Sequence, residues 1–267
     1  MTKFEVLVPL AESGKEVVVR EEGPNWFCAL ESALSGLGMA DSMKNVICDV
    51  KEDGAIHVTD TGSGRKFLVR ELDLTKNIQK IQEEPKKEEP KATRKDEMLA
   101  DLFTDVMDAW DLTDKEIPGF FLDLALKYIP SESGSFAKSD LSSTDLEFVA
   151  CRGPKGDDVC GIKIKVGQGL VGFSAKHSCY IAVGDVHKDP RFFKEISEKI
   201  GYETTSIACA PVRSMESSIT FGVLELINKK NSYRYNEDDL EFLRFIAEKM
   251  AELFHSKWTE SNNNLED

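Results

Sequence analysis

The residues best suited to chemistry lie in the second half of the chain, and they suit the binding of a small molecule. The glycine-rich run 167–172 lets backbone approach a ligand closely, because its glycines carry no side chain. The helix expected to begin within this run offers free N–H groups to an anion or a carbonyl oxygen. Farther along, Phe193 can stack on a planar ring, and Thr204 and Glu225 can hydrogen-bond to its edge.

Patterns typical of catalysis are not found in the sequence. No Gly-x-Ser-x-Gly, kinase or helical metalloprotease motif occurs, and none of the six cysteines forms a Cys-x-x-Cys pair. Most cysteines lie in apolar or strand-like contexts, where a thiol packs as a small apolar group. His187, near Asp185 and Asp189, belongs either to a metal site or to a polar loop, and we interpret it as a polar loop. We therefore predict no catalytic residues, no metal and no enzymatic activity.

The composition bounds the location and the partners of the protein. The 267 residues suffice for two domains, and 41% apolar with 31% charged residues is typical of a soluble globular protein. The net charge of −14 opposes general binding to nucleic-acid phosphates. No apolar run could span a bilayer, and the N-terminus lacks the apolar block of a signal peptide. We expect a cytoplasmic protein with no nucleic-acid partner and no membrane partner.

Residues 1–75 are predicted to form a small α+β domain with the element order β-β-α-β-β-β. Two β-rich runs come first, and Asn25 can cap a helix whose apolar stripe begins at Trp26. Trp26 is either an anchor for a partner or a core residue, and core is the simpler interpretation. We recognise no family here and interpret the domain as an accessory or interaction domain. Residues 76–96 combine two prolines with dense mixed charge, which predicts a flexible linker between two independently folding units.

The remaining residues are predicted to form a second α+β unit. An amphipathic helix carries apolar residues from Leu99 to Trp110, and another helix follows Pro118. Short strands and helices come next, then two long strands and a final helix that starts near Asn236. The polar residues 258–267 are expected to be a disordered tail.

Four segments, 167–172, 185–193, 201–206 and 222–229, occur in an order and at a spacing that resemble a GAF domain. This family is the small-molecule sensor module of bacterial and eukaryotic signalling proteins, and the resemblance covers residues 97–257. It implies an antiparallel sheet with helices on both faces and a ligand cavity between the sheet and the loops. It also implies that the terminal helices pair two copies of the chain, so we expect a parallel homodimer.

Cyclic-nucleotide-binding GAF domains, including bacterial ones, provide the site residues that this resemblance implies. The candidate ligand-binding residues are Ser135, Cys151, Arg152, Gly169, Leu170, Val171, Asp185, Phe193, Thr204, Thr205 and Glu225. The sequence departs from the pattern where Cys151 and Arg152 replace an aromatic-acid pair, where Leu240 replaces a glutamate, and where Ile200 replaces a hydroxyl residue.

Several of these residues have a second interpretation that the sequence leaves open. Phe193 and Leu170 could be plain core, and Glu225 could face solvent. Arg152 could meet a phosphate group or be a surface charge. Lys229 and Asp239, which fit the Asn-Lys…Asp signature of nucleotide binders, are expected to form a structural ion pair in either case.

Three functions follow from these patterns. The main hypothesis is a cytoplasmic regulatory protein whose GAF domain senses a small molecule, with a cyclic nucleotide as the candidate ligand. It would relay binding through the dimer helices and the N-terminal domain to an unidentified protein partner. The second is a GAF scaffold that only dimerises and binds no ligand. The third is the free methionine sulfoxide reductase, which shares the fold, but Val171 stands where that enzyme has a nucleophilic cysteine.

Overall fold

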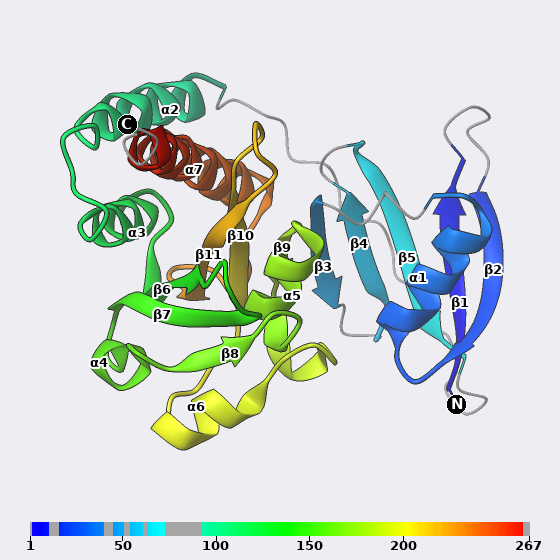
Figure 1. Cartoon of the computed structure of the whole chain (residues 1–267). Helices are drawn as coiled ribbons and strands as arrows, with labels where there is room; N and C mark the ends of the chain where they lie inside the picture. The colour runs from blue at the N-terminus through cyan, green and yellow to red at the C-terminus, as the bar shows by residue number, and fades with distance from the viewer. Residues whose placement is uncertain are drawn as a thin grey trace.

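The structure is a computed structural model that describes residues 2–10, 16–39, 45–50, 54–60, 63–72 and 92–263. The first five of these ranges form an N-terminal module, and residues 92–263 form a C-terminal module (Figure 1). The N-terminal module contains β1 (Thr2–Pro9), β2 (Glu16–Gly23), α1 (Trp26–Gly36), β3 (Asn45–Val50), β4 (Ile56–Asp60) and β5 (Arg65–Glu71). This is the β-β-α-β-β-β order that the sequence predicts.

The C-terminal module alternates helices and strands. Its elements are α2 (Ala92–Met107), α3 (Ile117–Tyr128), β6 (Ser131–Ser139), β7 (Asp145–Arg152), α4 (Gly156–Val159), β8 (Lys163–Lys165), α5 (Gly169–His177), β9 (Tyr180–Val183), the 3-10 helix η2 (Val186–Lys188), α6 (Lys194–Ile200), β10 (Ile207–Arg213), β11 (Thr220–Lys229) and α7 (Glu237–Asn263). The α+β prediction is confirmed. The elements α4 and η2 were not predicted, because each has at most four residues, too few to show a period.

The strands of both modules join in one eleven-stranded sheet with the order β2-β1-β5-β4-β3-β9-β10-β11-β6-β7-β8. All neighbouring strands in this order are antiparallel except β3 and β9, which run parallel from Asn45↔Tyr180 to Cys48↔Val183. Figure 1 shows this junction between the two modules. The sequence predicted two units joined only by a linker, because a parallel pair between distant segments leaves no local pattern in the sequence.

Two of the predicted boundaries differ from the structure. Residues 92–96, assigned to the linker, already belong to α2, and residues 73–91 lie outside the described residues. The final helix continues past residue 257 to Asn263, where a disordered tail was expected. Near this end of α7, the rings of His255 and Trp258, one helical turn apart, stack with 6.1 Å between their centroids. Residues 264–267 lie outside the described residues.

The core of the N-terminal module lies between α1 and one face of its strands. Asn25 caps α1 by accepting a hydrogen bond of 3.0 Å from the Cys28 N–H, as the sequence predicts. The buried side of α1 packs on β1, where the alternate residues Phe4, Val6 and Val8 are buried.

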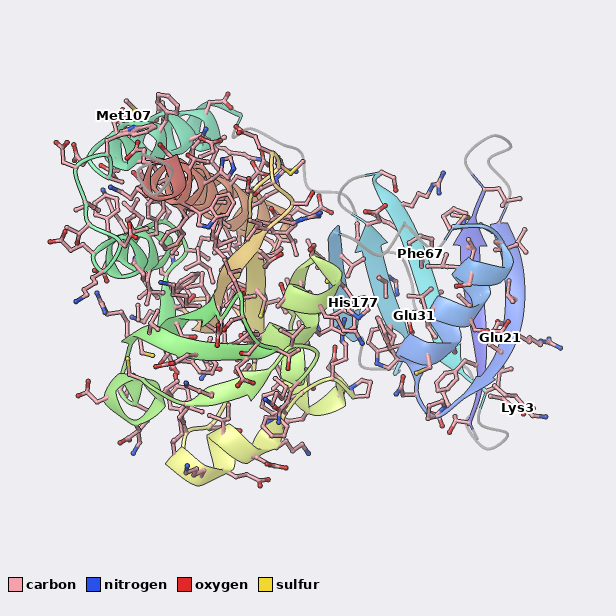
Figure 2. All side chains as sticks on the ribbon, viewed as in Figure 1. Lys3, Glu21, Glu31, Phe67, Met107 and His177 are labelled. Atoms are coloured by element: carbon pink, nitrogen blue, oxygen red, sulfur yellow. The ribbon has the colours of Figure 1, made fainter. Side chains whose placement is uncertain are left out.

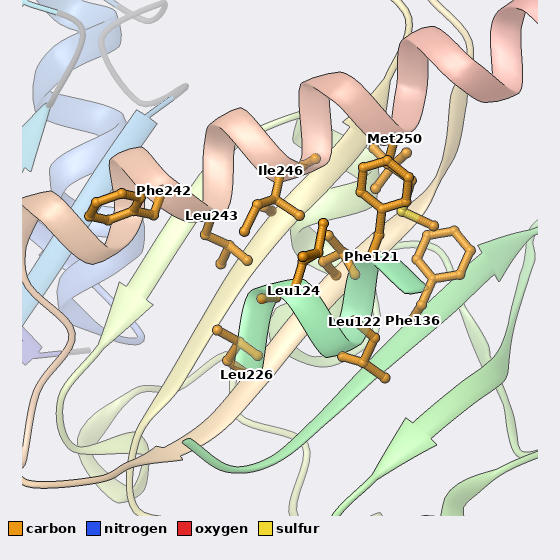
Figure 3. Close-up of a cluster of buried hydrophobic side chains, with 14 of the residues drawn as sticks. Phe121, Leu122, Leu124, Phe136, Leu226, Phe242, Leu243, Ile246 and Met250 are labelled. Carbon is orange, nitrogen blue, oxygen red and sulfur yellow. The ribbon is translucent and has the colours of Figure 1, made fainter. Parts of the chain in front are cut away.

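In the C-terminal module, helices cover both faces of the sheet. On one face, α3 and α7 pack on β6, β10 and β11, and α2 packs outside them. Figure 3 shows Leu243, Ile246 and Met250 of α7 facing Phe121 of α3 in this core, whose members are almost completely buried. Each such side chain contributes about 1.5–3 kcal/mol by leaving water. On the other face, α5 packs on β9, β10 and β11. No helix in the described parts of the chain combines the length and the apolar character needed to span a membrane.

Candidate ligand-binding site

A hollow lies on the α5 face of the C-terminal sheet, bounded by the ends of α5 and α6. Its cavity volume is about 90 Å³. Small-molecule sites usually have roughly 300–1,000 Å³, so a larger ligand would require the walls of the hollow to move apart. The floor comes from β6, β10 and β11, one wall from β7, α4 and β8, and the other from α5, α6 and the segment before α6.

Nine of the eleven residues predicted from the sequence line this hollow: Ser135, Cys151, Arg152, Gly169, Leu170, Val171, Phe193, Thr204 and Glu225. The other two lie outside it. Asp185 caps η2 by accepting from the His187 N–H, and it pairs with Lys188 at 3.1 Å. The N–H and hydroxyl of Thr205 both donate to Asn228 Oδ1, at 2.8 and 3.0 Å. Both side chains are hydrogen-bonded within the loops beside the hollow and do not line it.

Glu225 is the buried charged group on the floor of the hollow. Its side chain lies on β11 opposite Ser135 of β6, and the Ser135 hydroxyl donates a hydrogen bond of 2.8 Å to its Oε2. Burial raises the pKa of Glu225 from its ordinary 4.5 to about 7, and the Ser135 hydrogen bond opposes that rise. The alternative that Glu225 faces solvent is wrong, since the residue is 8% exposed. Near neutral pH this carboxyl can either accept or donate a hydrogen bond.

The glycine-rich run brings backbone against the hollow. Gly169 has a φ of +68° and begins α5, and a Cβ there would lie 3.0 Å from Phe193 Cβ. Gly172 lies one turn later, where a Cβ would meet the Lys165 carbonyl oxygen at 2.5 Å. Only glycine fits both positions. As a result, the first turn of α5, with Gly169, Leu170 and Val171, lies against the hollow. The first N–H groups of a helix have no acceptor within the helix itself.

An aromatic and aliphatic wall stands opposite the first turn of α5. Phe193 is the N-cap residue of α6 and is half-buried, and Phe192 before it also lines the hollow. Ile196 and Ile200 continue this wall along α6. Sequence reasoning found Phe193 from the family pattern alone, whereas Phe192, Ile196 and Ile200 carry a helical spacing that could have indicated them.

Two cationic side chains lie at the rim. The Arg152 guanidinium is held by both carboxylate oxygens of Asp123 on α3, at 2.7 and 3.0 Å. This ion pair neutralises the charge that a phosphate group would need. Lys155, which the sequence analysis did not single out, also lines the hollow and lies 3.3 Å from Asp158.

A hydrogen-bond network lies beside the hollow, around Asn228 near the end of β11. Most of its residues were not predicted from the sequence. Asn228 Nδ2 donates to Glu132 Oε2 at 2.9 Å and to the Glu203 carbonyl at 2.8 Å. The Tyr202 hydroxyl accepts from Ser133 Oγ at 2.8 Å and donates to Glu132 at 3.1 Å. Asn228 has a φ of +55°, a conformation that asparagine adopts more readily than most residues. The Asn-Lys signature already pointed to Asn228, but the loop residues have no signal of their own.

The expected ion pair between Lys229 and Asp239 is confirmed. Their side chains, 11% and 13% exposed, connect the end of β11 to the first turn of α7. Asp239 also accepts from the Asn236 N–H at 2.7 Å. The pair therefore stabilises the fold beside the hollow and takes no part in lining it.

The Cys151 thiol, which lines the hollow, is not set up as a nucleophile. Burial and the neighbouring Cys160 raise the pKa of Cys151 to about 12, so its thiol is protonated at neutral pH. All six cysteines are free thiols. Among the residues that the structure describes, no three His, Cys, Asp or Glu side chains are grouped to hold a metal ion.

Comparison with known proteins identifies the C-terminal module. The model of the GAF domain family matches residues 119–252, just over half of the 267-residue chain. The chain therefore belongs to the GAF domain family.

Curated relatives match the same module. A dual 3',5'-cyclic-AMP and -GMP phosphodiesterase 11A of Takifugu rubripes is 33% identical over 100 residues, which are 35% of this chain and 11% of the relative. A cGMP-specific 3',5'-cyclic phosphodiesterase of Drosophila melanogaster is 38% identical over 84 residues, 31% of this chain and 7% of the relative. The match thus spans about a tenth of the length of these enzymes.

Solved structures share the fold. The GAF domain of an Acinetobacter phosphoenolpyruvate-protein phosphotransferase superimposes with a TM-score of 0.53 at 15% identity, covering 64% of this chain and 99% of that domain. A free methionine-R-sulfoxide reductase from Neisseria meningitidis gives 0.51 at 19% identity, with 65% and 96% covered. At these identities the likeness concerns the fold alone.

Proposed function

We propose that the chain is a regulatory protein whose GAF domain binds a cyclic nucleotide in the hollow beside Phe193. The observation that carries this proposal is the convergence of three kinds of group on one space. These are an aromatic ring at Phe193, a buried hydrogen-bonding carboxyl at Glu225 and the open first turn of α5. A purine nucleotide needs all three, for its base face, its base edge and its phosphate. The relatives from Takifugu rubripes and Drosophila melanogaster are cyclic-nucleotide phosphodiesterases, which supports the same ligand class.

The position of each group suggests how the ligand lies. Phe193 would stack on the base, and Thr204 and Glu225 would hydrogen-bond to its edge. The cyclic phosphate would meet the N–H groups of Gly169 to Val171, with Lys155 at the rim. Since Asp123 pairs with Arg152 and Asp158 pairs with Lys155, the N–H groups at the start of α5 are the main partners for the phosphate.

Calorimetry of the full chain with cyclic GMP, cyclic AMP and cyclic di-GMP tests this proposal. We expect saturable binding of one of them, and a loss of about 1–3 kcal/mol of binding free energy on Phe193→Ala. The control is Tyr233→Ala, which removes an aromatic ring that is 91% exposed and does not line the hollow. Absence of heat with all three ligands, or equal losses in both variants, would reject the proposal.

A dimer is the second part of the proposal, because α2 and the turn after it present an exposed apolar stripe. Phe103 and Met107 of α2 are 53% and 52% exposed, and Trp110 of the following turn is 56% exposed. Figure 2 shows Met107 on the outer side of α2, away from the sheet. We propose that a second copy covers this stripe and that the ligand state reaches a partner through the paired helices. Sedimentation that shows a monomer at micromolar concentration would contradict it.

A further inference from the structure

Arg191 is a buried cation at the junction of the two modules. Its side chain is 7% exposed, and the Asp189 side chain that holds it is 1% exposed. Arg191 Nε and Nη2 donate to the two carboxylate oxygens of Asp189 at 2.9 and 2.6 Å. The Arg191 backbone N–H also donates to Asp189, at 2.9 Å. The segment between η2 and α6 is therefore held together by the hydrogen bonds between its own Asp189 and Arg191.

Three aromatic rings from both modules enclose the guanidinium, and we call them the aromatic cage. The Arg191 Cζ lies 5.5 Å from the ring centroid of Trp26, 4.9 Å from that of Phe27 and 4.9 Å from that of Phe173. Trp26 and Phe27 belong to α1, whereas Phe173 belongs to α5. A cation on the faces of such rings is attracted by their quadrupoles, most strongly out of water.

Other contacts place the cage beside β3, the strand of the N-terminal module that pairs with β9. Arg191 Nη2 also lies 3.7 Å from the Sγ of Cys48, on the strand that pairs with β9. The ring of His177 at the end of α5 contacts that of Phe173 in a tilted arrangement, with 4.2 Å between the centroids. Figure 2 shows His177 beside the N-terminal module, on the side where Glu31 of α1 lies. Arg191 therefore contacts the N-terminal module through both α1 and β3.

The same segment forms a wall of the ligand hollow. The two residues after Arg191, Phe192 and Phe193, line the hollow, and Phe193 packs against Gly169. The Phe192 N–H donates to the Asp189 carbonyl at 3.1 Å. The Asp189–Arg191 pair and the aromatic wall of the hollow therefore belong to one short hydrogen-bonded segment.

Hydrogen bonding at the cage is also incomplete. Among the described residues, Arg191 Nη1 and Trp26 Nε1 are buried polar atoms with no hydrogen-bond partner. Burying two donors without acceptors opposes docking, so the contact is less stable than its packing alone would make it. A contact of this kind can open when a neighbouring segment changes.

We propose that Arg191 is a positioning residue that couples the hollow to the docking of the N-terminal module. With the cage closed, Arg191 holds Phe192 and Phe193 in the wall of the hollow. A ligand that fixes Phe193 then favours docking of the N-terminal module. Undocking of that module lowers the affinity for the ligand by the same factor, because coupling between two sites is reciprocal. The ligand half of this inference rests on the proposed function, but the contact between cage and hollow does not.

The first test needs no ligand. The chain has three tryptophans, so Trp110→Phe with Trp258→Phe leaves Trp26 as the only emitter. In this background we compare Arg191→Met with the double variant Asp189→Asn/Arg191→Met, which leaves no buried charge unpaired. We expect both to increase acrylamide quenching of Trp26 and amide exchange in residues 45–50. Lys188→Met is the matched control, because Lys188 is an exposed cation in the same segment and should change neither readout. Unchanged quenching in the double variant would overturn the proposal.

The second test starts from the hollow. Phe193→Ala should also increase quenching of Trp26, although Phe193 does not belong to the cage. Ile164→Ala removes a side chain from the opposite wall of the hollow and should leave Trp26 unchanged. Equal effects of the two variants would show general loosening of the module and overturn the coupling.

The third test adds whichever of cyclic GMP, cyclic AMP and cyclic di-GMP binds. We expect the ligand to reduce quenching of Trp26, and we expect the double variant to bind it at least about 5-fold more weakly. If none of the three nucleotides binds, the proposed function fails, while the first two tests still decide the contact between cage and hollow. Binding with equal affinity to both proteins would overturn the coupling and leave the proposed function intact.

Discussion

The buried carboxyl of Glu225 makes the stability of the protein depend on pH in a way that one substitution removes. Folding raises the pKa of Glu225 from 4.5 to about 7, so the folded state holds a proton that the unfolded state has lost over this range. Stability from this group is complete below pH 4.5 and is lost as the pH rises toward 7. Glu225→Gln replaces the carboxyl by a neutral group of the same size and removes this dependence.

The size of the effect follows from the shift. A change of roughly 2.5 pKa units corresponds to about 3 kcal/mol, and the group is buried, so solvent screens it little. The difference in free energy of unfolding between the Glu225→Gln variant and the wild type should therefore grow by about 3 kcal/mol in favour of the variant between pH 4.5 and pH 7.5. Other consequences of the substitution add a constant and do not affect this slope.

Urea unfolding at intervals of half a pH unit measures this difference. Glu147→Gln, which removes an exposed carboxylate on β7, two strands away from Glu225 in the sheet, should show the wild-type dependence on pH. Ser135→Ala should extend the dependence to higher pH, because its hydroxyl lowers the pKa of Glu225. A difference between Glu225→Gln and wild type that stays constant over this range would refute the assignment of a buried, neutralised carboxyl.

Three further substitutions test the frame of the hollow by urea unfolding. Lys229→Met leaves Asp239 buried without its cation and should cost about 3–5 kcal/mol, and a loss below 1 kcal/mol would contradict the ion pair. Gly172→Ala places a Cβ 2.5 Å from the Lys165 carbonyl and should cost about 1–3 kcal/mol, so an unchanged stability would show that α5 begins elsewhere. Asn228→Ala removes the hydrogen bonds that hold the loop 203–206 and should cost about 1–3 kcal/mol with faster amide exchange there, whereas unchanged exchange would exclude that role.

The fold was largely predictable from the sequence because most of its elements carry a local pattern. The apolar stripe and the Asn25 cap predicted α1, and the short run 180–183 predicted β9. The parallel contact of β3 with β9 was not predictable, since it joins segments more than 130 residues apart without a shared motif. The cage around Arg191 was missed for the same reason, although the sequence correctly assigned Trp26 to a core.

The candidate site was predictable where a residue type has few alternatives. The family pattern led to Gly169, Phe193 and Glu225, and the structure places all three on the hollow. It did not reveal that Asp123 takes up the charge of Arg152, because an ion pair between a helix and a strand has no sequence signature. The loop residues were the least predictable, as Asp185 and Thr205 show, since their side chains follow turn geometry rather than a period.

The central claim is that a cyclic nucleotide binds in the hollow between Phe193 and Glu225. A crystal structure of the full chain grown with the nucleotide that gives heat in calorimetry tests it most directly. The account predicts the base stacked on the Phe193 ring, its edge within hydrogen-bond distance of Glu225, and the phosphate at the first turn of α5. Nucleotide bound elsewhere, or a hollow filled by its own side chains while the nucleotide is bound, would contradict it.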